Sequence, residues 1–397
     1  MKDASIGERI RELRGSTLSQ RRLAERAEVS VDLIRKLEQG SRTGASIASL
    51  HKIARALDVD IADLLGKRHG LPSPDPDAGV VAIRRALTTV DDLLDSVAGQ
   101  EPVSLLEATR AVEYAWGAYW SGRYGVLASI LPSGIAQLRA AAHAAQSQDI
   151  APVNEQLARM MWVTGCTLVH FGQTDPAFIA IREALQAAER GNDPLLAATL
   201  RGSVGWQLLV QGRFEEARGV ALKAAATVEP AGDVPPAHLS VYGALLLQGA
   251  TAAGRNQHTG EAISLAREAR ETATRLGRDR KDYETDFGPS QVVMQTVDIN
   301  ISAEKYSEAI QVAKTMPNHG AGLKPVAQAR HLVDQAQALA RTGQHQKALD
   351  MLLTAERVGG SEWAKYQTLL RTVIAELLDH DRRTSLRDLA QRVGVNS

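Results

Sequence analysis

Residues 18–40, LSQRRLAERAEVSVDLIRKLEQG, carry the pattern that decides the fold of the N-terminal region. Ser19 and Ser30 each stand directly before a short segment whose apolar residues recur at helical spacing, which is where N-cap residues stand. Only three residues, 28–30, separate the two segments. The stretch therefore predicts two short helices joined by a tight turn.

Further short helices are predicted on both sides of this pair. The upstream segment ends at Gly15, as helices commonly do at glycine. The downstream segments follow Ser46 and Asp60, which are suited to be N-caps. These additional helices are predicted over residues 6–14, 47–58 and 61–66, which makes five helices in the first 68 residues.

This arrangement resembles the phage-repressor or XRE helix-turn-helix family. The resemblance covers about residues 5–66 and rests on residues 18–40 together with SLHKIARALDVDIADLLG at 49–66. One departure is Glu28, which stands in the turn where the family usually has glycine. A non-glycine residue at positive φ costs roughly 1 kcal/mol, so the turn is expected to be either strained or differently shaped. The resemblance implies a DNA-binding domain whose second helix enters the major groove.

In such a domain, the N-terminal part of the helix over residues 31–38 faces base edges. Arginine and lysine donate to guanine, aspartate accepts from cytosine, and valine contacts the thymine methyl group. A solvated helix face is the alternative for the two basic residues. Base reading is predicted for Val31, Asp32, Arg35 and Lys36, and phosphate contact for Gln20, Arg21, Arg22, Ser41 and Arg42. Glu38 is expected to be a structural partner within the domain.

The net charge of zero is the sum of two unequal parts. Residues 1–68 hold 14 basic and 10 acidic side chains, and the remainder holds 32 and 36. A basic head on an acidic body favours nucleic-acid contact at the head. A net charge of only +4 suggests that affinity comes from dimerisation and specific contacts more than from bulk electrostatics. Between the parts, residues 69–79 place Pro72, Pro74 and Pro76 at every second position, which predicts an extended linker.

Residues 80–360 show no alternating strand pattern. A turn signature recurs instead at intervals of about 40 residues, with a glycine five positions before an alanine. Small residues seven positions before the turn would let paired helices approach closely, and prolines are predicted at the ends of second helices. The turn residues are Gly172, Gly212 and Gly343, with weaker copies at Gly122, Gly254 and Glu304; the small residues are Ala115, Gly165, Gly205 and Ala336; the prolines are Pro132, Pro230 and Pro317.

This repeat resembles the tetratricopeptide (TPR) helix-turn-helix unit, which implies an α-solenoid over residues 80–360 and an all-α chain. In TPR repeats, set positions of each first helix line a concave groove. Applied here they give Trp116, Tyr119, Trp120, Arg159, Trp162, Cys166, His170, Trp206, Gln248, Gln291, Met294, Asp298, Arg330 and Gln337.

An aromatic-lined concavity of this kind is a candidate ligand site. Arg159 and Arg330 are suited to pair with a carboxylate, and the glutamines to bond a peptide backbone. The alternative is that a register error of one residue returns the tryptophans to the core. Cys166 is expected to be a buried small side chain.

Residues 361–380 are predicted as one long amphipathic helix, and residues 361–397 as capping helices or a dimer contact. The sequence lacks a GxxxxGK[ST] loop, a GxGxxG turn after a strand, HExxH and GxSxG, so nothing indicates an enzyme. Its histidines form no i, i+4 pair, so no metal or cofactor is predicted. No apolar run or signal segment indicates a membrane, and a cytoplasmic protein is expected.

The two-part layout resembles the RRNPP family of peptide-responsive bacterial regulators, and also actinobacterial regulators of the same layout. It implies a homodimeric transcriptional regulator that binds a palindromic DNA operator. Its repeat domain would sense a ligand, as in quorum sensing: a short peptide or a hydrophobic small molecule such as a signalling lactone. The alternative is a TPR adaptor that binds a regulatory protein, with DNA binding secondary.

Overall fold

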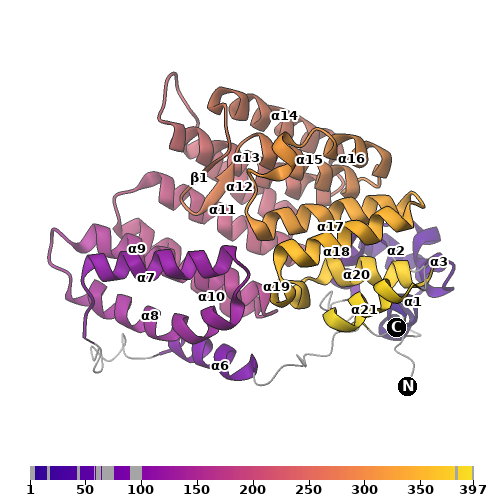
Figure 1. Cartoon of the computed structure of the whole chain (residues 1–397), viewed down its shortest axis with the longest axis horizontal. Coiled ribbons are helices and arrows are strands. Elements are labelled where there is room, and N and C mark those ends of the chain that lie inside the picture. The colour runs from indigo at the N-terminus through magenta and orange to yellow at the C-terminus, as the bar shows by residue number, and fades with distance from the viewer. Residues whose placement is uncertain are drawn as a thin grey trace.

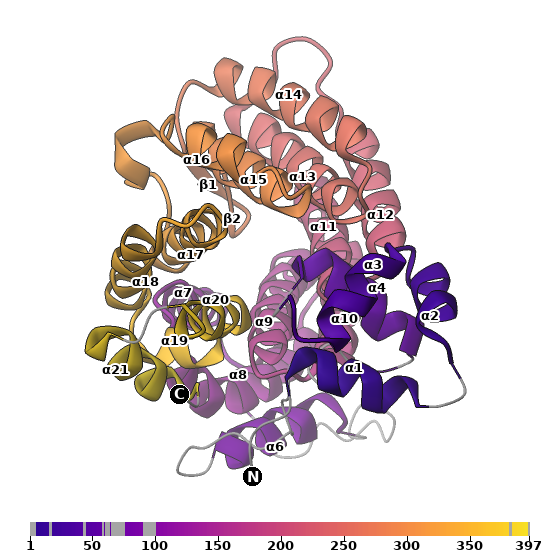
Figure 2. The ribbon, with the colours of Figure 1, turned by 90° about the vertical axis from the view of Figure 1, so that its right-hand side faces the viewer.

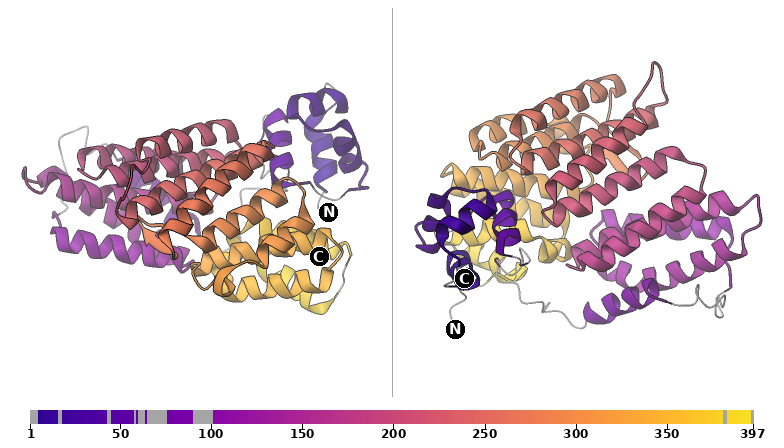
Figure 3. Two further views of the ribbon diagram at one scale, coloured as in Figure 1. Left: turned by 90° about the horizontal axis from the view of Figure 1, so that it is seen from above. Right: turned by 180° about the vertical axis from the view of Figure 1, so that it is seen from behind.

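The computed structural model describes residues 5–15, 18–42, 45–57, 59, 64, 76–89, 101–380 and 383–395. The chain is a small helical head followed by a large helical body (Figure 1). The head lies toward the same end of the molecule as the C-terminal helices of the body, as Figures 1 and 3 both show. The all-α fold predicted from the sequence is therefore confirmed, apart from one short hairpin.

The head contains four described helices around one apolar core. Ser5, Ser19 and Ser30 each accept a hydrogen bond from a backbone N–H in the first turn of the following helix. Ile10, Leu23, Ile34, Leu50 and Ile53 are fully buried in the core. The predicted helix over residues 61–66 lies outside the described residues, except for the buried Leu64. The helices are α1 (Ile6–Arg14), α2 (Gln20–Ala27), α3 (Val31–Glu38) and α4 (Ile47–Leu57).

The turn between α2 and α3 is left-handed, which is the strained one of the two alternatives considered from the sequence. Glu28 adopts φ 51° and ψ 44° without being glycine. Lys52 Nζ lies 3.6 Å from Glu28 Oε2, and the lysine side chain is only 5% exposed. This ion pair ties the strained turn to α4.

The body begins earlier than predicted. Helix α6 (Pro76–Leu87) includes the last four residues of the predicted linker, 69–79. Proline suits the first position of a helix because the N–H it lacks would have no partner there. Gly79 brings α6 close to α8, since a Cβ on it would lie 2.6 Å from Ala128 Cβ. The absence of a side chain at this glycine thus lets α6 join the body.

Most of the body, from residue 105 to residue 359, consists of six helix pairs that follow one another round an arc (Figure 2). A 3₁₀ turn, η2 (Pro317–Gly320), precedes the last pair. The pairs are α7 (Leu105–Trp120) with α8 (Tyr124–Ala144), α9 (Ile150–His170) with α10 (Thr174–Arg190), α11 (Pro194–Val210) with α12 (Phe214–Thr227), α13 (Pro236–Arg255) with α14 (Thr259–Leu276), α15 (Pro289–Ser302) with α16 (Tyr306–Ala313), and α17 (Pro325–Arg341) with α18 (His345–Gly359).

In each of the six pairs, the two helices are joined by a turn that contains one residue in the left-handed conformation. Four of these turns use glycine and two do not, namely Gln257 and Glu304. Two predictions made for this region are wrong. Gly254 is inside α13, and the turn residue is Gln257, five positions before Ala262 as in the other repeats. Pro132 lies inside α8 rather than at its end.

Among the described helices, only α8 is long and apolar enough to cross a membrane, with a mean hydropathy of 1.2 over 18 residues. Its Leu127, Leu131 and Ile135 are fully buried in the protein core. The apolar character of α8 is thus used in packing against α6 and α9.

A two-stranded hairpin between α14 and α15 was not predicted. Strand β1 (Arg280–Asp282) pairs antiparallel with β2 (Thr285–Phe287). Three-residue strands are too short to show alternation in the sequence. Phe287 is fully buried against Gly243, where a Cβ would lie 2.0 Å from the ring. The hairpin is thereby seated on the inner side of α13.

The predicted single helix over residues 361–380 is two helices. The backbone leaves the helical region at Gln367, with φ −88° and ψ 104°. This break lets α19 (Ser361–Tyr366) pack on α18, with Trp363 buried, while α20 (Thr368–Leu378) packs on α17. Helix α21 (Thr384–Val393) covers both α19 and α20.

Candidate DNA interface and ligand pocket

The four predicted base-reading residues lie on an exposed face of α3. Val31 is 43% exposed, which is unusual for an apolar side chain on a helix whose other apolar residues are buried. The side chains of Asp32, Arg35 and Lys36 are each about half exposed. This face can approach another molecule without rearrangement of the head.

Asp32 neutralises the two basic residues of this face. Its carboxylate pairs with Arg35 and lies 2.7 Å from Lys36 Nζ. The hydrogen bond from Lys36 is the main reason that the pKa of Asp32 is lowered. Reading of bases by Arg35 and Lys36 would require them to exchange this carboxylate for base edges.

The predicted phosphate residues on α2 already have partners within the head. Arg21 Nε lies 3.1 Å from Glu25 Oε1, on an exposed surface. Gln20 Nε2 donates to Glu38 Oε2 at 2.8 Å, and Glu38 also receives two bonds from Arg14, at 2.8 and 3.0 Å. The structural role predicted for Glu38 is confirmed. The amide of Gln20, in contrast, serves to hold α1, α2 and α3 together.

The residues that follow α3 differ in where they lie. Ser41 Oγ donates to the Lys36 carbonyl oxygen at 3.2 Å, which caps the end of α3. Arg42 Nη2 lies 3.1 Å from Glu304 Oε1, in the turn between α15 and α16. Arg22 is exposed at the start of α2. The body therefore holds the side chain of Arg42 in this structure, and its contact with a DNA phosphate stays a prediction.

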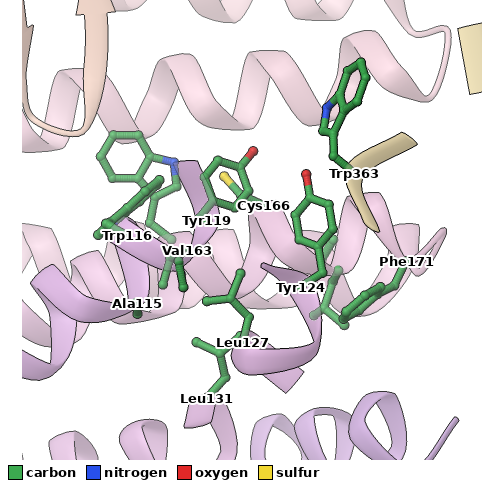
Figure 4. Close-up of a cluster of buried hydrophobic side chains, with 14 of the residues drawn as sticks. Ala115, Trp116, Tyr119, Tyr124, Leu127, Leu131, Val163, Cys166, Phe171 and Trp363 are labelled. Atoms are coloured by element: carbon green, nitrogen blue, oxygen red, sulfur yellow. The ribbon is translucent and has the colours of Figure 1, made fainter. Parts of the chain in front are cut away.

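The predicted groove has two parts with different chemistry. The first, which we name the aromatic end, consists of Trp116, Tyr119, Trp120, Trp162 and His170 on α7 and α9. The ring of Trp116 lies 5.0 Å from that of Trp162 and 6.0 Å from that of Trp120, measured between centroids. Figure 4 shows Trp116, Tyr119 and Cys166 close together above Leu127 and Leu131.

The aromatic end is a packed core and not an open groove. Trp116, Tyr119 and Trp162 are 2%, 7% and 5% exposed. Trp116 and Trp162 therefore lie in the core, as in the alternative considered from the sequence. Their rings fill the space between α7 and α9, since offset and edge-to-face contacts bury large apolar areas.

Two further groove residues belong to this packed region. His170 Nε2 lies 3.2 Å from the Tyr119 hydroxyl, and its ring stacks on Tyr124. Burial lowers the pKa of His170 to about 4, so it is neutral at physiological pH. Cys166 is buried as expected, and burial raises the pKa of its thiol to about 12.

Arg159 meets the hairpin instead of open space. Its guanidinium lies 5.6 Å from the Tyr283 ring centroid and 3.7 Å from Glu284 Oε1. Arg159 was predicted to pair with a ligand carboxylate, and in this structure the carboxylate comes from the chain itself. Sequence reasoning missed this contact because it did not predict the hairpin.

The second part of the groove, which we name the polar end, surrounds a pocket of about 200 Å³. Five predicted groove residues from four different repeats line it. Gln291 and Gln337 are buried, but they do not line the pocket. The predicted lining residues are Trp206, Gln248, Met294, Asp298 and Arg330, and they are joined by Gly205, Leu209, Ala217, Thr251, Arg255, Gln295 and Asp334.

Two arginines and two aspartates form a charge network across the polar end. Arg255 lies 3.0 Å from Asp298, and Arg330 lies 3.6 Å from Asp298 and 3.0 Å from Asp334. Burial raises the pKa of Asp334 to about 6, although the charge of Arg330 opposes this. The pocket wall thus combines a charge-balanced polar network with apolar surface from Trp206, Leu209, Ala217 and Met294.

Sequence reasoning missed Arg255 and Asp334. Because Gly254 was taken as the turn residue, the repeat positions at the end of α13 were assigned wrongly. The five-residue spacing from Gln257 to Ala262 would have given the correct positions. Asp334 stands four residues after Arg330, a spacing at which opposite charges pair on one helix face. Both signals were present in the sequence.

Residues 5–65 match the profile of a helix-turn-helix domain family. The chain therefore carries an N-terminal helix-turn-helix domain, followed by a TPR-like helical repeat domain. No curated protein sequence matches the chain at a significant level.

Two solved structures are similar to this chain. One is Bacillus thuringiensis PlcR in complex with the peptide PapR7 and DNA, with 11% identity, a TM-score of 0.40, and coverage of 87% of this chain and 98% of that one. The other is a Rap protein complexed with Competence and Sporulation Factor, with 10% identity, a TM-score of 0.45, and coverage of 73% and 87%.

Proposed function

We propose that this protein is a ligand-controlled transcriptional regulator. The head binds operator DNA through α3, and the polar end of the body binds the ligand. The observation that carries the proposal is the convergence of residues from four repeats on one pocket, in a chain that begins with a helix-turn-helix domain.

In this proposal Val31, Asp32, Arg35 and Lys36 read base edges. Arg21, Arg22 and Ser41 contact phosphate, and Arg42 does so when it is released from Glu304. Two heads would be needed for a palindromic operator, because half-sites lie about 34–36 Å apart for one helical turn. We therefore propose a homodimer.

The pocket volume constrains the ligand. About 200 Å³ is smaller than the ~300–1,000 Å³ of typical small-molecule sites, so the pocket would hold one side chain of a peptide or a small molecule. Trp206 and Met294 would cover its apolar part, and Gln248 and Arg255 would bond its polar groups.

The DNA part is tested with the variant Arg35→Ala/Lys36→Ala. DNA fragments bound by the wild-type protein are first selected from genomic DNA, and binding of these fragments is then measured. Loss of more than tenfold in affinity is expected, because each specific base contact is worth about 1–3 kcal/mol. Unchanged binding and regulation would reject this function in favour of the protein-interaction adaptor.

The ligand part is tested by thermal shift with a panel of short peptides and acyl lactones. Trp206→Ala should abolish the shift caused by any active compound while leaving DNA binding intact. Tyr114→Ala is a suitable control because Tyr114 is 52% exposed and does not line the pocket. Equal shifts in both variants would place the ligand elsewhere.

A further inference from the structure

The head touches the body at two turns of the solenoid. Arg42, directly after α3, pairs with Glu304 in the turn between α15 and α16. His51 of α4 packs on the turn between α11 and α12, at Gly212 and Phe214. The two turns are far apart in the sequence, but both contact the head. Together they form a docking surface on the body (Figure 2).

The first contact places Arg42 among acidic and polar groups of the body. Glu304 Oε1 lies 3.1 Å from its guanidinium, and Glu376 and Tyr306 lie within range of its charge. A carboxylate and a phosphate are bound by a guanidinium in the same manner, through charge-assisted hydrogen bonds. Glu304 therefore offers Arg42 the chemistry that DNA would offer it.

The second contact depends on a glycine. Gly212 has φ +76°, and a Cβ on it would lie 3.0 Å from His51 Nδ1. The His51 ring meets the Phe214 ring edge-to-face at 5.7 Å between centroids. Absence of a side chain at Gly212 thus allows α4 to approach the turn closely.

Both turns are the ends of helices that line the pocket. Helix α11 supplies Trp206 and Leu209 to the pocket, and α15 supplies Met294 and Asp298. Arg255 also lines the pocket, and its positive charge is among the causes that lower the pKa of His51, after burial. A change of spacing between α11 and α15 would therefore move the two docking points relative to each other.

We propose that these two turns form an internal docking surface for the head, on which Glu304 takes the place of a DNA phosphate. Arg42 cannot hold Glu304 and a phosphate in the same position, so docking on the body and full engagement of DNA compete. Occupation of the pocket shifts this competition by changing the spacing of the turns. The inference rests on the proposed function and specifies its regulation.

The first test measures binding of the full-length protein to a duplex of mixed sequence at low salt. Glu304→Gln should bind about fivefold more tightly than wild type, which is the upper range for loss of one exposed ion pair. The matched control is Glu308→Gln, which makes the same charge change on the exposed surface of α16. Equal binding by the two variants would overturn the proposal, because the effect would then be one of net charge.

A double-mutant cycle separates docking from a general gain of affinity. In an Arg42→Ala background, Glu304→Gln should no longer change DNA affinity. If the gain persists without Arg42, Glu304 does not act as the competitor for that side chain, and the proposal fails.

The second docking point is tested with Gly212→Ala. The new methyl group strains the turn and also presses on His51, so DNA binding should tighten severalfold. Gly343→Ala is the control, because Gly343 has a similar backbone conformation, φ +77°, and a methyl group on it would meet nothing within 4 Å. A gain that is equal in both variants would reflect backbone strain and would contradict docking at Gly212.

The outcomes also distinguish this inference from the proposed function. If Arg35→Ala/Lys36→Ala does not weaken binding, DNA recognition by α3 is wrong. If that variant does lose binding but Glu304→Gln and Gly212→Ala behave like their controls, the head binds DNA and only the docking inference is wrong.

Discussion

The residues of the aromatic end and those of the polar end stand at equivalent positions of different repeats. The aromatic end is closed, whereas the polar end encloses a pocket. Trp116 and Trp162 pack ring against ring with almost no exposed surface. Arg255, Asp298 and Arg330 meet across about 200 Å³ of space.

Side-chain chemistry explains the difference. Large aromatic rings gain free energy by excluding water, so neighbouring first helices close over them. The aspartates of the polar end are also buried, but they pair with Arg255 and Arg330 and leave a space of about 200 Å³ between the helices. Repeat position thus determines which face a residue occupies, and residue type determines whether that face stays open.

The largest effect is expected when a ring is removed from the aromatic end. Trp116→Ala should lower the free energy of unfolding of the body by about 3–5 kcal/mol, as for other buried large side chains. Trp206→Ala should cost less than half as much, since Trp206 is partly exposed beside the pocket. Denaturant unfolding of both variants measures the contrast; equal losses would mean that the two ends are packed alike.

The two ends should respond to acid in opposite ways. At the aromatic end, the pKa of His170 is about 4 in the folded protein and ~6.5 when unfolded. The unfolded chain therefore binds more protons between these values, and stability falls as pH drops from 6.5 to 4. His170→Gln keeps a polar partner for Tyr119 but does not titrate. The variant should therefore lose less free energy of unfolding than wild type as the pH falls, by up to about 3 kcal/mol at pH 4. Unfolding curves recorded between pH 6.5 and pH 4 measure this difference.

At the polar end the sign is reversed. The pKa of Asp334 is raised to about 6 in the folded protein, above its unfolded value of ~3.9. The folded chain thus holds the proton more tightly, and this group adds stability as pH falls from 6 to 4. Asp334→Asn should abolish that gain. An unchanged slope of unfolding free energy against pH would show that Asp334 is ionised throughout the range.

The smallest effect on stability is expected at two glycines that let paired helices approach closely, Gly165 at the aromatic end and Gly205 at the polar end. A Cβ would lie 3.1 Å from the Ala177 carbonyl oxygen at Gly165, and 3.1 Å from the Ala217 carbonyl oxygen at Gly205. Gly165→Ala should destabilise by about 1 kcal/mol or slightly more, because its surroundings are tightly packed. Gly205→Ala should be tolerated better beside the pocket. Thermal unfolding of the pair provides the comparison.

Sequence reasoning predicted local features well and long-range contacts poorly. Ser19 and Ser30 cap their helices as predicted, because a cap involves residues only three positions apart. The break at Gln367 and the partner of Arg42 were missed, because both depend on residues brought together by folding. The hairpin between α14 and α15 was missed because its strands are too short to show alternation, and because Phe287 packs on residues of α13 such as Gly243 that are distant in the sequence.

The sequence by itself determined the two-part helical architecture, the positions of the repeat turns with glycine, and the acidic and basic division between head and body. These properties follow from helical periodicity, capping and composition, which act over a few residues. Only the tertiary structure decided that the aromatic groove residues pack shut, that the polar ones surround a pocket, and that Arg42 rests on Glu304. Packing and desolvation act between distant segments, so they became visible only when the solenoid placed those segments side by side.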